Sequence, residues 1–311
     1  MRLAILPGTA NSTLASAIAA LLGTAARQRD ITRFPDGELG ISLTESVRGD
    51  DVYVVQPASP PVNEHLVELL LLADACRRDG AARITAVMPY VGYARQDRRT
   101  GRSALGGRLM ADLIAAAGVD RVVAVDVHTP AIEGFFGAPV EHLTAVPLLA
   151  ERARPGLPRD SVIVAPDLGA AKLAERYARL LDLPVAFVHK RRITATEVAV
   201  HQVTGDVAGR APLIVDDMIS TGATIEAAAN AVLAAGARSE ITVAATHALL
   251  VGRAVEWLRG LGLRRLVVTD SVALPADAPL PLEVVSLDRL LADALARLHG
   301  APAPGAAAAS G

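Results

Sequence analysis

Short runs rich in valine and isoleucine alternate with alanine- and leucine-rich stretches along nearly the whole chain. The runs predict buried strands, and the stretches between them have the length and composition of helices. Such alternation favours parallel sheets covered by helices, because parallel strands need a crossover connection. We therefore predict an α/β fold with strands at 51–56, 84–88, 121–126, 162–165, 185–189, 213–215, 241–245 and 266–269, and helices at 63–78, 107–117, 170–181, 225–235, 252–261 and 287–298.

Two segments of the chain repeat one pattern. Residues 51–126 and 213–270 both read as a strand, a loop, a helix and two further strands. The first copy has Gln56 and a proline-rich loop where the second has two acids and a Thr-Gly turn. The pattern predicts two domains, at 1–150 and 151–285, with a boundary near the Pro/Arg/Gly stretch 152–158. A final helix at 286–300 and a disordered Ala/Pro/Gly/Ser tail at 301–311 complete the prediction.

The second copy contains the most informative motif. An apolar run ends in Asp216 and Asp217, and the small residues Ser220-Thr221-Gly222-Ala223-Thr224 follow before a helical stretch. A turn from strand to helix offers backbone N–H groups and a helix N-terminus to a phosphate. The acids lie where sugar hydroxyls or a metal could be held. The alternative is an ordinary turn with a capping threonine, but the acid pair together with the Thr-Gly-Ala-Thr run favours a phosphate site.

Cationic residues follow two other predicted strands. Arg95 and Gln96 lie in a basic turn, where the arginine could hold a polyphosphate and the glutamine could contact a base edge. Lys190-Arg191-Arg192 ends a later strand, and adjacent cations without a compensating acid suit a polyanion. The alternative for both clusters is a solvated basic surface. Lys190 is one of only two lysines in the chain, which mildly favours a specific role.

Two further strands end in residues that bind metals. His128 closes the sequence Asp126-Val127-His128, and Asp167 follows Pro166 after the strand at 162–165. Either residue alone is more often structural. Because ligands of parallel sheets bind beyond the carboxyl ends of the strands, the two together favour a divalent cation on phosphates.

Composition excludes several classes of protein. The 311 residues carry a formal net charge of −2, which argues against nucleic acid as a partner. The apolar N-terminal run is too short for a signal peptide or a membrane span. The single cysteine, Cys76, excludes a disulfide framework and fits a reducing compartment, so we expect a cytoplasmic protein. Cys76 falls in a predicted helix, where a packing role is favoured over catalysis.

Together these motifs resemble the ribose-phosphate pyrophosphokinase family, from Met1 to about Leu298. Several independent motifs in the family's order make the resemblance specific, whereas any one alone would be weak. They are Arg33-Phe34-Pro35-Asp36-Gly37-Glu38, Gly92-Tyr93-Ala94-Arg95-Gln96-Asp97, Asp126-Val127-His128, Glu133-Gly134-Phe135-Phe136, Pro166-Asp167, Lys190-Arg191-Arg192 and the loop 216–224.

The resemblance implies an enzyme that transfers the β,γ-pyrophosphoryl group of ATP to the anomeric hydroxyl of ribose 5-phosphate, with Mg²⁺ as cofactor. The products are phosphoribosyl pyrophosphate and AMP. It implies two tandem phosphoribosyltransferase-type domains, each a mainly parallel sheet flanked by helices, in a homo-oligomer with shared active sites. It implies ATP binding by Arg95 and Gln96, and by Phe34, Asp36 and Glu38 acting in a neighbouring subunit's site. It implies metal binding by His128 and Asp167, and catalysis by Lys190 and Arg192 on a loop over the pyrophosphate. The residues implied to bind ribose 5-phosphate are Asp216, Asp217, Ser220, Thr221, Gly222, Ala223 and Thr224.

Two departures from the family's pattern leave alternatives open. Many members carry an acid where this chain has Ser220, and the segment 100–108 is shorter than usual and lacks the family's Pro and Glu. A non-catalytic regulatory paralogue is one alternative, against which the intact Lys190, Arg192 and acid pair count. A phosphoribosyltransferase is another, disfavoured by the duplicated architecture and by the arginines at 95–99.

Overall fold

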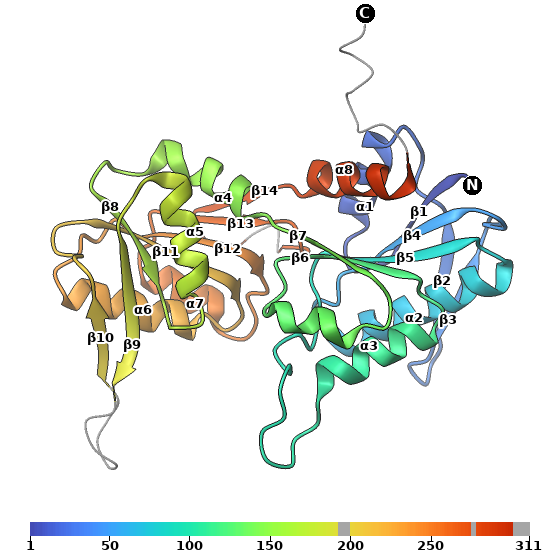
Figure 1. Cartoon of the computed structure of the whole chain (residues 1–311), viewed down its shortest axis with the longest axis horizontal. Coiled ribbons are helices and arrows are strands. Elements are labelled where there is room, and N and C mark those ends of the chain that lie inside the picture. Colours follow the sequence, from blue (N-terminus) through green and yellow to red (C-terminus); the bar gives the residue numbers. More distant parts are fainter. Residues whose placement is uncertain (192–199, 275–277, 301–311) are drawn as a thin grey trace, which may run out of the picture. The chain divides into compact units, whose positions relative to one another are not determined.

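The computed structural model describes residues 1–191, 200–274 and 278–300, which form two compact units (Figure 1). The first unit comprises Met1–Leu143, Ser271–Ala273 and residues 286–300; the second comprises Thr144–Asp270 and Leu274–Val285 without the undescribed positions. Arg192 and the predicted tail at 301–311 lie outside the described residues.

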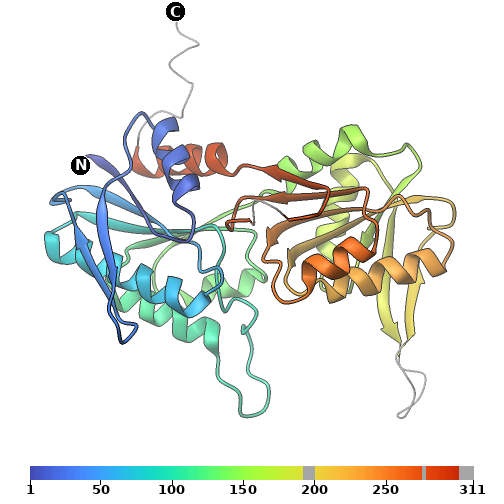
Figure 2. The same ribbon diagram turned by 180° about the vertical axis from the view of Figure 1, so that it is seen from behind.

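The first unit contains a parallel sheet. Its five described strands run in the order β1 (Leu3–Pro7), β4 (Asp51–Val55), β5 (Arg83–Met88), β6 (Arg121–Val125) and β7 (Val140–Leu143). A separate antiparallel hairpin is formed by β2 (Arg29–Arg33) and β3 (Leu39–Leu43). Helices α1 (Ser12–Leu21) and α8 (Asp288–His299) cover one face of the sheet, and α2 (Val62–Asp79) and α3 (Gly106–Ala116) cover the other (Figure 2).

The second unit contains a larger mixed sheet. Its seven described strands run in the order β10 (Val200–Thr204), β9 (Val185–Arg191), β8 (Ser161–Ala165), β11 (Ala211–Ile219), β12 (Thr242–Ala248), β13 (Arg265–Thr269) and β14 (Leu282–Val285). Only β10 pairs antiparallel among these strands. The helices that flank this sheet are α4 (Val146–Ala153) and α5 (Ala171–Leu181) on one face, with α6 (Ala223–Ala234) and α7 (Ala254–Gly260) on the other.

Both units bury the apolar runs that predicted their strands. The strands β4, β8 and β12 are buried along their whole length, as expected for parallel strands covered on both faces. The predicted α/β class, with two units that each contain a mainly parallel sheet flanked by helices, is confirmed. None of the described helices has both the length and the apolar character needed to cross a membrane.

The two units repeat one order of elements. In each unit, however, one helix comes from the other half of the chain. The series β1, α1, hairpin, β4, α2, β5, α3, β6, β7 corresponds to β8, α5, β9–β10, β11, α6, β12, α7, β13, β14. The helix after β7 is α4, which belongs to the second unit, and the helix after β14 is α8, which belongs to the first. The first continuous segment of the first unit therefore ends at Leu143, before the proline-containing stretch where the boundary was predicted.

Two element boundaries differ from the prediction in the region of the acid pair. The strand β11 was predicted to end at Val215, but it continues through both acids to Ile219, because Asp216 and Met218 pair with Ala245 and His247 of β12. Helix α6 begins at Ala223 rather than Ile225. The acid pair therefore lies in a strand, and the phosphate-type loop is shorter than the sequence indicated.

Candidate active site

The carboxyl ends of parallel strands in the second unit bring several of the predicted residues to one edge. Strands β9, β8, β11 and β12 are neighbours in the sheet. Asp167 follows β8, and Asp216 and Asp217 lie near the end of β11. The backbone of Lys190 is near the end of β9, whereas its side chain is outside what the structure describes. This edge is where parallel sheets bind their ligands.

Among the acids of this edge, Asp216 has the pKa that is shifted most. Burial raises its pKa well above the ordinary value, and the negative charges of Asp217 and Asp167 raise it further. The Asp217 backbone N–H donates to Asp216 Oδ1 at 2.9 Å, which opposes the shift without cancelling it. A carboxylate held among like charges favours the arrival of a cation or of hydroxyl donors.

The loop after β11 presents backbone N–H groups. Gly222 is the N-cap of α6 with a φ of 83°, a left-handed conformation that glycine adopts without strain. The Val251 N–H donates to the Ser220 carbonyl at 3.0 Å and thereby holds the start of the loop. Among the described residues, none accepts a hydrogen bond from the N–H of Thr221, Ala223 or Thr224, and these three residues are exposed. The loop therefore offers free donors at a helix N-terminus, as a phosphate requires.

Asp167 lies in a turn that caps the neighbouring helix. Its Oδ1 accepts a hydrogen bond of 3.1 Å from the Ala170 N–H, just before α5. The residue is exposed, and its charge reaches Asp216. The turn thus keeps a carboxylate beside the acid pair while leaving it accessible.

In the first unit, the segment after β5 forms an open pocket. Arg95 and Gln96 line it with Val62, Tyr90 and Tyr93, and its volume is about 460 Å³. Across the described part of the chain, no carboxylate pairs with Arg95, which is exposed. A pocket of this size with an unneutralised guanidinium and aromatic walls suits a nucleotide polyphosphate.

Tyr90 and Tyr93 are site residues that the sequence analysis missed. Tyr93 has a φ of 63°, and its hydroxyl donates to Asn63 Oδ1 at 2.5 Å, which ties the segment after β5 to α2. A left-handed non-glycine residue costs free energy and is retained where surrounding contacts demand it. The sequence signal was present, since two aromatic residues follow a buried strand within five positions.

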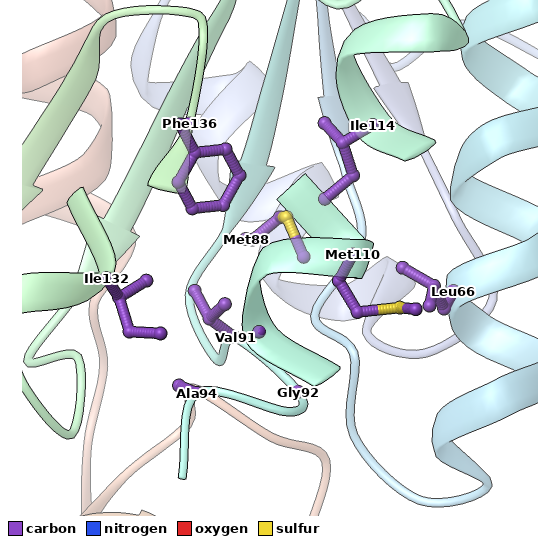
Figure 3. A pocket seen from close by; sticks show the side chains of 10 residues that line it. Leu66, Met88, Val91, Gly92, Ala94, Met110, Ile114, Ile132 and Phe136 are labelled. Atoms are coloured by element: carbon purple, nitrogen blue, oxygen red, sulfur yellow. The ribbon is translucent and has the colours of Figure 1, made fainter. Parts of the chain in front are cut away.

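A small apolar cavity lies behind this segment (Figure 3). Its volume is about 10 Å³, and its walls include Val91, Met110, Ile114 and Phe136. The space is far too small for a substrate, and its walls are apolar. It therefore shows that the segment 91–94 packs on a hydrophobic base while Arg95 and Gln96 face outward.

The remaining predicted residues lie at two other places in the first unit. Phe34, Asp36 and Glu38 are at the tip of the β2–β3 hairpin, where all three are exposed and the Phe34 ring is 48% exposed. The Glu38 N–H donates to Asp36 Oδ1 at 3.1 Å, which shapes the tip. His128 is exposed in the turn after β6.

The donor set bears on which metal could bind. Within the described residues there is no cluster of three or more His, Cys, Asp or Glu side chains close enough to hold a metal by themselves. Mg²⁺ is usually bound by one or two carboxylates, several waters and substrate phosphates rather than by a complete protein cage. Asp216 and Asp217 beside a phosphate-type loop therefore fit a divalent metal that arrives with its substrate.

Comparison with protein families covers most of the chain. Residues 3–118 match the family described as the N-terminal domain of ribose phosphate pyrophosphokinase, and residues 154–256 match the phosphoribosyl transferase domain. Among curated proteins, the ribose-phosphate pyrophosphokinase of Gloeobacter violaceus is 44% identical over 96% of this chain and 90% of its own length. The protein of that name from Bacillus caldolyticus is 42% identical over 93% of this chain and 92% of its own.

A solved structure is also similar over nearly the full length. The crystal structure of phosphoribosylpyrophosphate synthetase from Mycobacterium smegmatis superposes with a TM-score of 0.89 and is 38% identical. The match covers 96% of this chain and all of the other. The likeness thus includes both units rather than one recurring domain.

Proposed function

Because the chain belongs to the ribose-phosphate pyrophosphokinase family, we propose that the edge of the second sheet binds ribose 5-phosphate and that the pocket after β5 binds ATP. The chain is a pyrophosphoryl transferase. It transfers the β,γ-pyrophosphoryl group of ATP to the anomeric hydroxyl of ribose 5-phosphate and yields phosphoribosyl pyrophosphate and AMP.

The 5-phosphate of the sugar suits the loop after β11. The N–H groups of Thr221, Ala223 and Thr224 and the N-terminus of α6 provide oriented donors for its oxygens. Asp216 and Asp217 are acceptors for ribose hydroxyls. The substitution of serine for an acid at position 220 leaves these donors in place, since the Ser220 carbonyl is held by Val251.

The nucleotide suits the pocket after β5. Arg95 contributes a guanidinium for the phosphates, and Gln96 contributes an amide for a base edge. The shorter segment 100–108 does not remove either group, because both precede it. Lys190 and Arg192 would neutralise the charge that develops on the transferring group, which is the main task of a protein in such reactions.

The family implies a divalent metal, and we propose that it is Mg²⁺. When bound, Mg²⁺ spreads the charge of the phosphates and so makes the β-phosphorus open to attack. Asp216 and Asp217 would hold it with the sugar in the second unit. We further propose that His128 and Asp167 contribute on the nucleotide and pyrophosphate side.

The observation that carries this proposal is the set of loop N–H groups without an acceptor among the described residues, next to the half-buried pair Asp216 and Asp217. The decisive experiment incubates purified protein with ATP, MgCl₂ and ribose 5-phosphate and separates the nucleotides by chromatography. Ribose 5-phosphate-dependent formation of AMP supports the proposal. ADP would indicate a γ-phosphoryl kinase, and no turnover at all would support the regulatory paralogue.

The same assay with phosphoribosyl pyrophosphate and a free purine base separates the other alternative. A phosphoribosyltransferase would release pyrophosphate from these substrates without ATP. We expect no such release, because the duplicated architecture and the arginines at 95–99 fit a nucleotide site rather than a site for a free base.

We also propose that the active sites are shared between copies of the chain. The exposed Phe34 ring beside Asp36 and Glu38 suits an adenine, which stacks on the ring while a carboxylate accepts the exocyclic amine. An Asp36→Ala/Glu38→Ala chain mixed with a Lys190→Ala chain should recover part of the activity. Full activity in a monomer, or no recovery after proven subunit exchange, would rule out sharing.

We also propose that the protein is located in the cytoplasm. Cys76, the single cysteine, is buried in α2 and unpaired, and burial raises the pKa of its thiol to about 12. Such a thiol is inert and needs no oxidising environment.

A further inference from the structure

The turn that carries His128 is built on a residue in a sparsely populated conformation. Asp126, directly after β6, has a φ of 38°. A left-handed conformation costs a non-glycine residue free energy, so neighbouring contacts must hold it in place. The contacts that do so determine where the backbone of His128 lies.

Two consecutive hydrogen bonds from this turn go to the neighbouring strand β7. The Asp126 N–H donates to the Leu143 carbonyl at 3.0 Å, and the Val127 N–H donates to Nε2 of His142 at 3.2 Å. The first bond involves only backbone and is available to any residue at 143. The second depends on the side chain at position 142. Val127 also packs against the hydrophobic core of the first unit, so the turn is held on both sides.

His142 lies in register with the end of β6. It pairs with Ala124 across β6 and β7, which places its ring beside the residues that immediately follow the strand. Accepting the Val127 N–H requires an Nε2 without a proton, so the Nδ1 tautomer is the one present. Glu141, one position earlier, forms an ion pair with Arg297 of α8. Adjacent residues of β7 therefore serve different elements.

We propose that His142 is a positioning residue, whose imidazole fixes the turn 126–128 and thereby orients His128 toward the nucleotide. This role rests on the proposed function of His128. It does not require His142 to touch a substrate. It explains why an exposed side chain on an edge strand receives a backbone N–H that solvent could otherwise satisfy.

The test compares three variants of β7 with the unmodified full-length protein. His142→Leu removes the acceptor, and His142→Gln restores one, because Gln Oε1 and His Nε2 are the same number of bonds from the backbone. Glu141→Gln is the matched control on the same strand. Amide hydrogen exchange of peptides covering 124–130 is measured without nucleotide, and the kinetic constants are measured with ATP and MgCl₂.

The proposal expects faster exchange at 124–130 in His142→Leu only, with the thermal midpoint near that of Glu141→Gln. It also expects about a tenfold loss in kcat, which corresponds to about 1.4 kcal/mol, with a smaller change in KM for ribose 5-phosphate. His142→Gln should recover most of the rate. Unchanged exchange in His142→Leu would overturn the positioning role whatever the enzyme does.

The two proposals fail in different ways. If the unmodified protein forms no AMP, the proposed function fails while the exchange data still decide whether His142 holds the turn. If the protein is active and His142→Leu exchanges faster but keeps its kcat, the turn is held by His142 and the link to catalysis is overturned.

Discussion

The two units share one order of strands and helices, yet they differ in whether backbone N–H groups at the carboxyl edge of the sheet have acceptors within the chain. In the first unit, the Thr9 N–H donates to Glu68 at 2.7 Å and the Ala10 N–H donates to Gln56 at 3.1 Å. In the second, the N–H groups of the loop 221–224 have no acceptor within the described residues. The first of these loops follows β1, the counterpart of β8, and the second follows β11. A duplicated fold therefore keeps its architecture while its strand-end loops differ in whether their N–H groups are bonded within the chain.

The residues that fill the first unit's edge are themselves deeply buried. Gln56 is fully buried where the second unit has Asp216, and its side-chain oxygen would lie 2.0 Å from a Cβ at Gly8. Glu68 is 3% exposed, and its second oxygen accepts the Thr9 hydroxyl at 2.5 Å. With an uncharged amide at the end of β4 and a carboxylate of α2 bonded to Thr9, this edge does not suit a sugar phosphate.

Buried carboxylates sharpen the contrast. Asp51 of β4 is fully buried, and burial alone would raise its pKa; hydrogen bonds from Arg83, His299 and Tyr53 outweigh burial, so its pKa is lowered. Asp216 has no such partner within the described residues, and its pKa is raised by burial and by its acidic neighbours. Asp51 therefore bonds partners within the fold, whereas Asp216 is the acid that we propose binds a ligand.

The largest expected effect concerns the cations of the second unit, whose counterparts in the first unit are the hairpin residues around Phe34. Lys190→Ala and Arg192→Ala should each lower kcat by roughly 100-fold or more with little change in KM, since their charge acts on the transition state. Steady-state AMP formation measures this, with the exposed Arg179→Ala of α5 as control. Modest rises in KM with kcat intact would reduce the cluster to a surface patch.

Asp216→Asn tests whether the acid pair serves a ligand. Loss of a charge-assisted acceptor costs about 1.5–3 kcal/mol, so kcat/KM for ribose 5-phosphate should fall roughly 10- to 100-fold. The ligand-free protein should instead unfold at a higher temperature at pH 7. The folded state raises the pKa of Asp216, so its ionisation destabilises the fold above the unfolded-state pKa of about 3.9.

The pH dependence of the change in thermal midpoint caused by Asp216→Asn tests the direction of the pKa shift. The gain in thermal midpoint should be largest near neutral pH and should vanish below about pH 4, where the acid is protonated in both states. Asp206→Asn is the control, because Asp206 is exposed and paired with Arg210. A lower midpoint for Asp216→Asn at pH 7 would make the acid structural.

Glu68→Ala tests the role of the side chains that accept hydrogen bonds from the N–H groups after β1 in the first unit. It removes the carboxylate that accepts from the N–H and the hydroxyl of Thr9. Hydrogen bonds to a charged group contribute about 1.5–3 kcal/mol, so urea unfolding should show a loss of that order, whereas the kinetic constants should stay near those of the unmodified protein. Glu64→Ala, one turn earlier on α2, removes only an exposed ion pair with Arg33 and should cost about 1 kcal/mol at most. A larger loss of activity than of stability would mean that this edge binds a substrate.

Ser220→Asp should have the smallest effect. If serine is an accepted variant in the loop, the change in KM for ribose 5-phosphate stays at about two- to threefold, or roughly 0.5 kcal/mol. Isothermal titration with ribose 5-phosphate gives the binding constant independently. Activity gained from an inert unmodified chain would instead identify Ser220 as the mark of a regulatory paralogue.

The elements that pattern alone predicted are those with a strong apolar period. The strands at 51–56 and 121–126 and the helix at 63–78 lie within one residue of β4, β6 and α2. The hairpin strands were not predicted from pattern, because Ile31 is the only apolar residue of β2 and the strand therefore has little apolar area to bury. The end of β11 was misplaced because acids usually end a strand, and only pairing with β12 carries it through them.

Some residues of the candidate site could be predicted from the sequence, and others could not. Residue types at predicted strand ends pointed to Asp167, Asp216 and the loop 220–224, since parallel strands place their carboxyl ends at one edge. Tyr93 and His142 did not stand out, because their partners are Asn63 and Val127, which lie 30 and 15 positions away. Such pairings depend on how helices and strands are brought together.

By itself, the sequence determined the α/β class, the duplication and the chemistry available at each strand end, because these follow from local periodicity and from the fixed geometry of parallel sheets. Only the tertiary structure decided that α4 and α8 each belong with the other half of the chain, and that Glu68 bonds Thr9 across 59 positions. Buried N–H groups must find acceptors wherever the packed chain supplies them. Which edge is left open to a ligand is therefore a property of the whole fold rather than of any one motif.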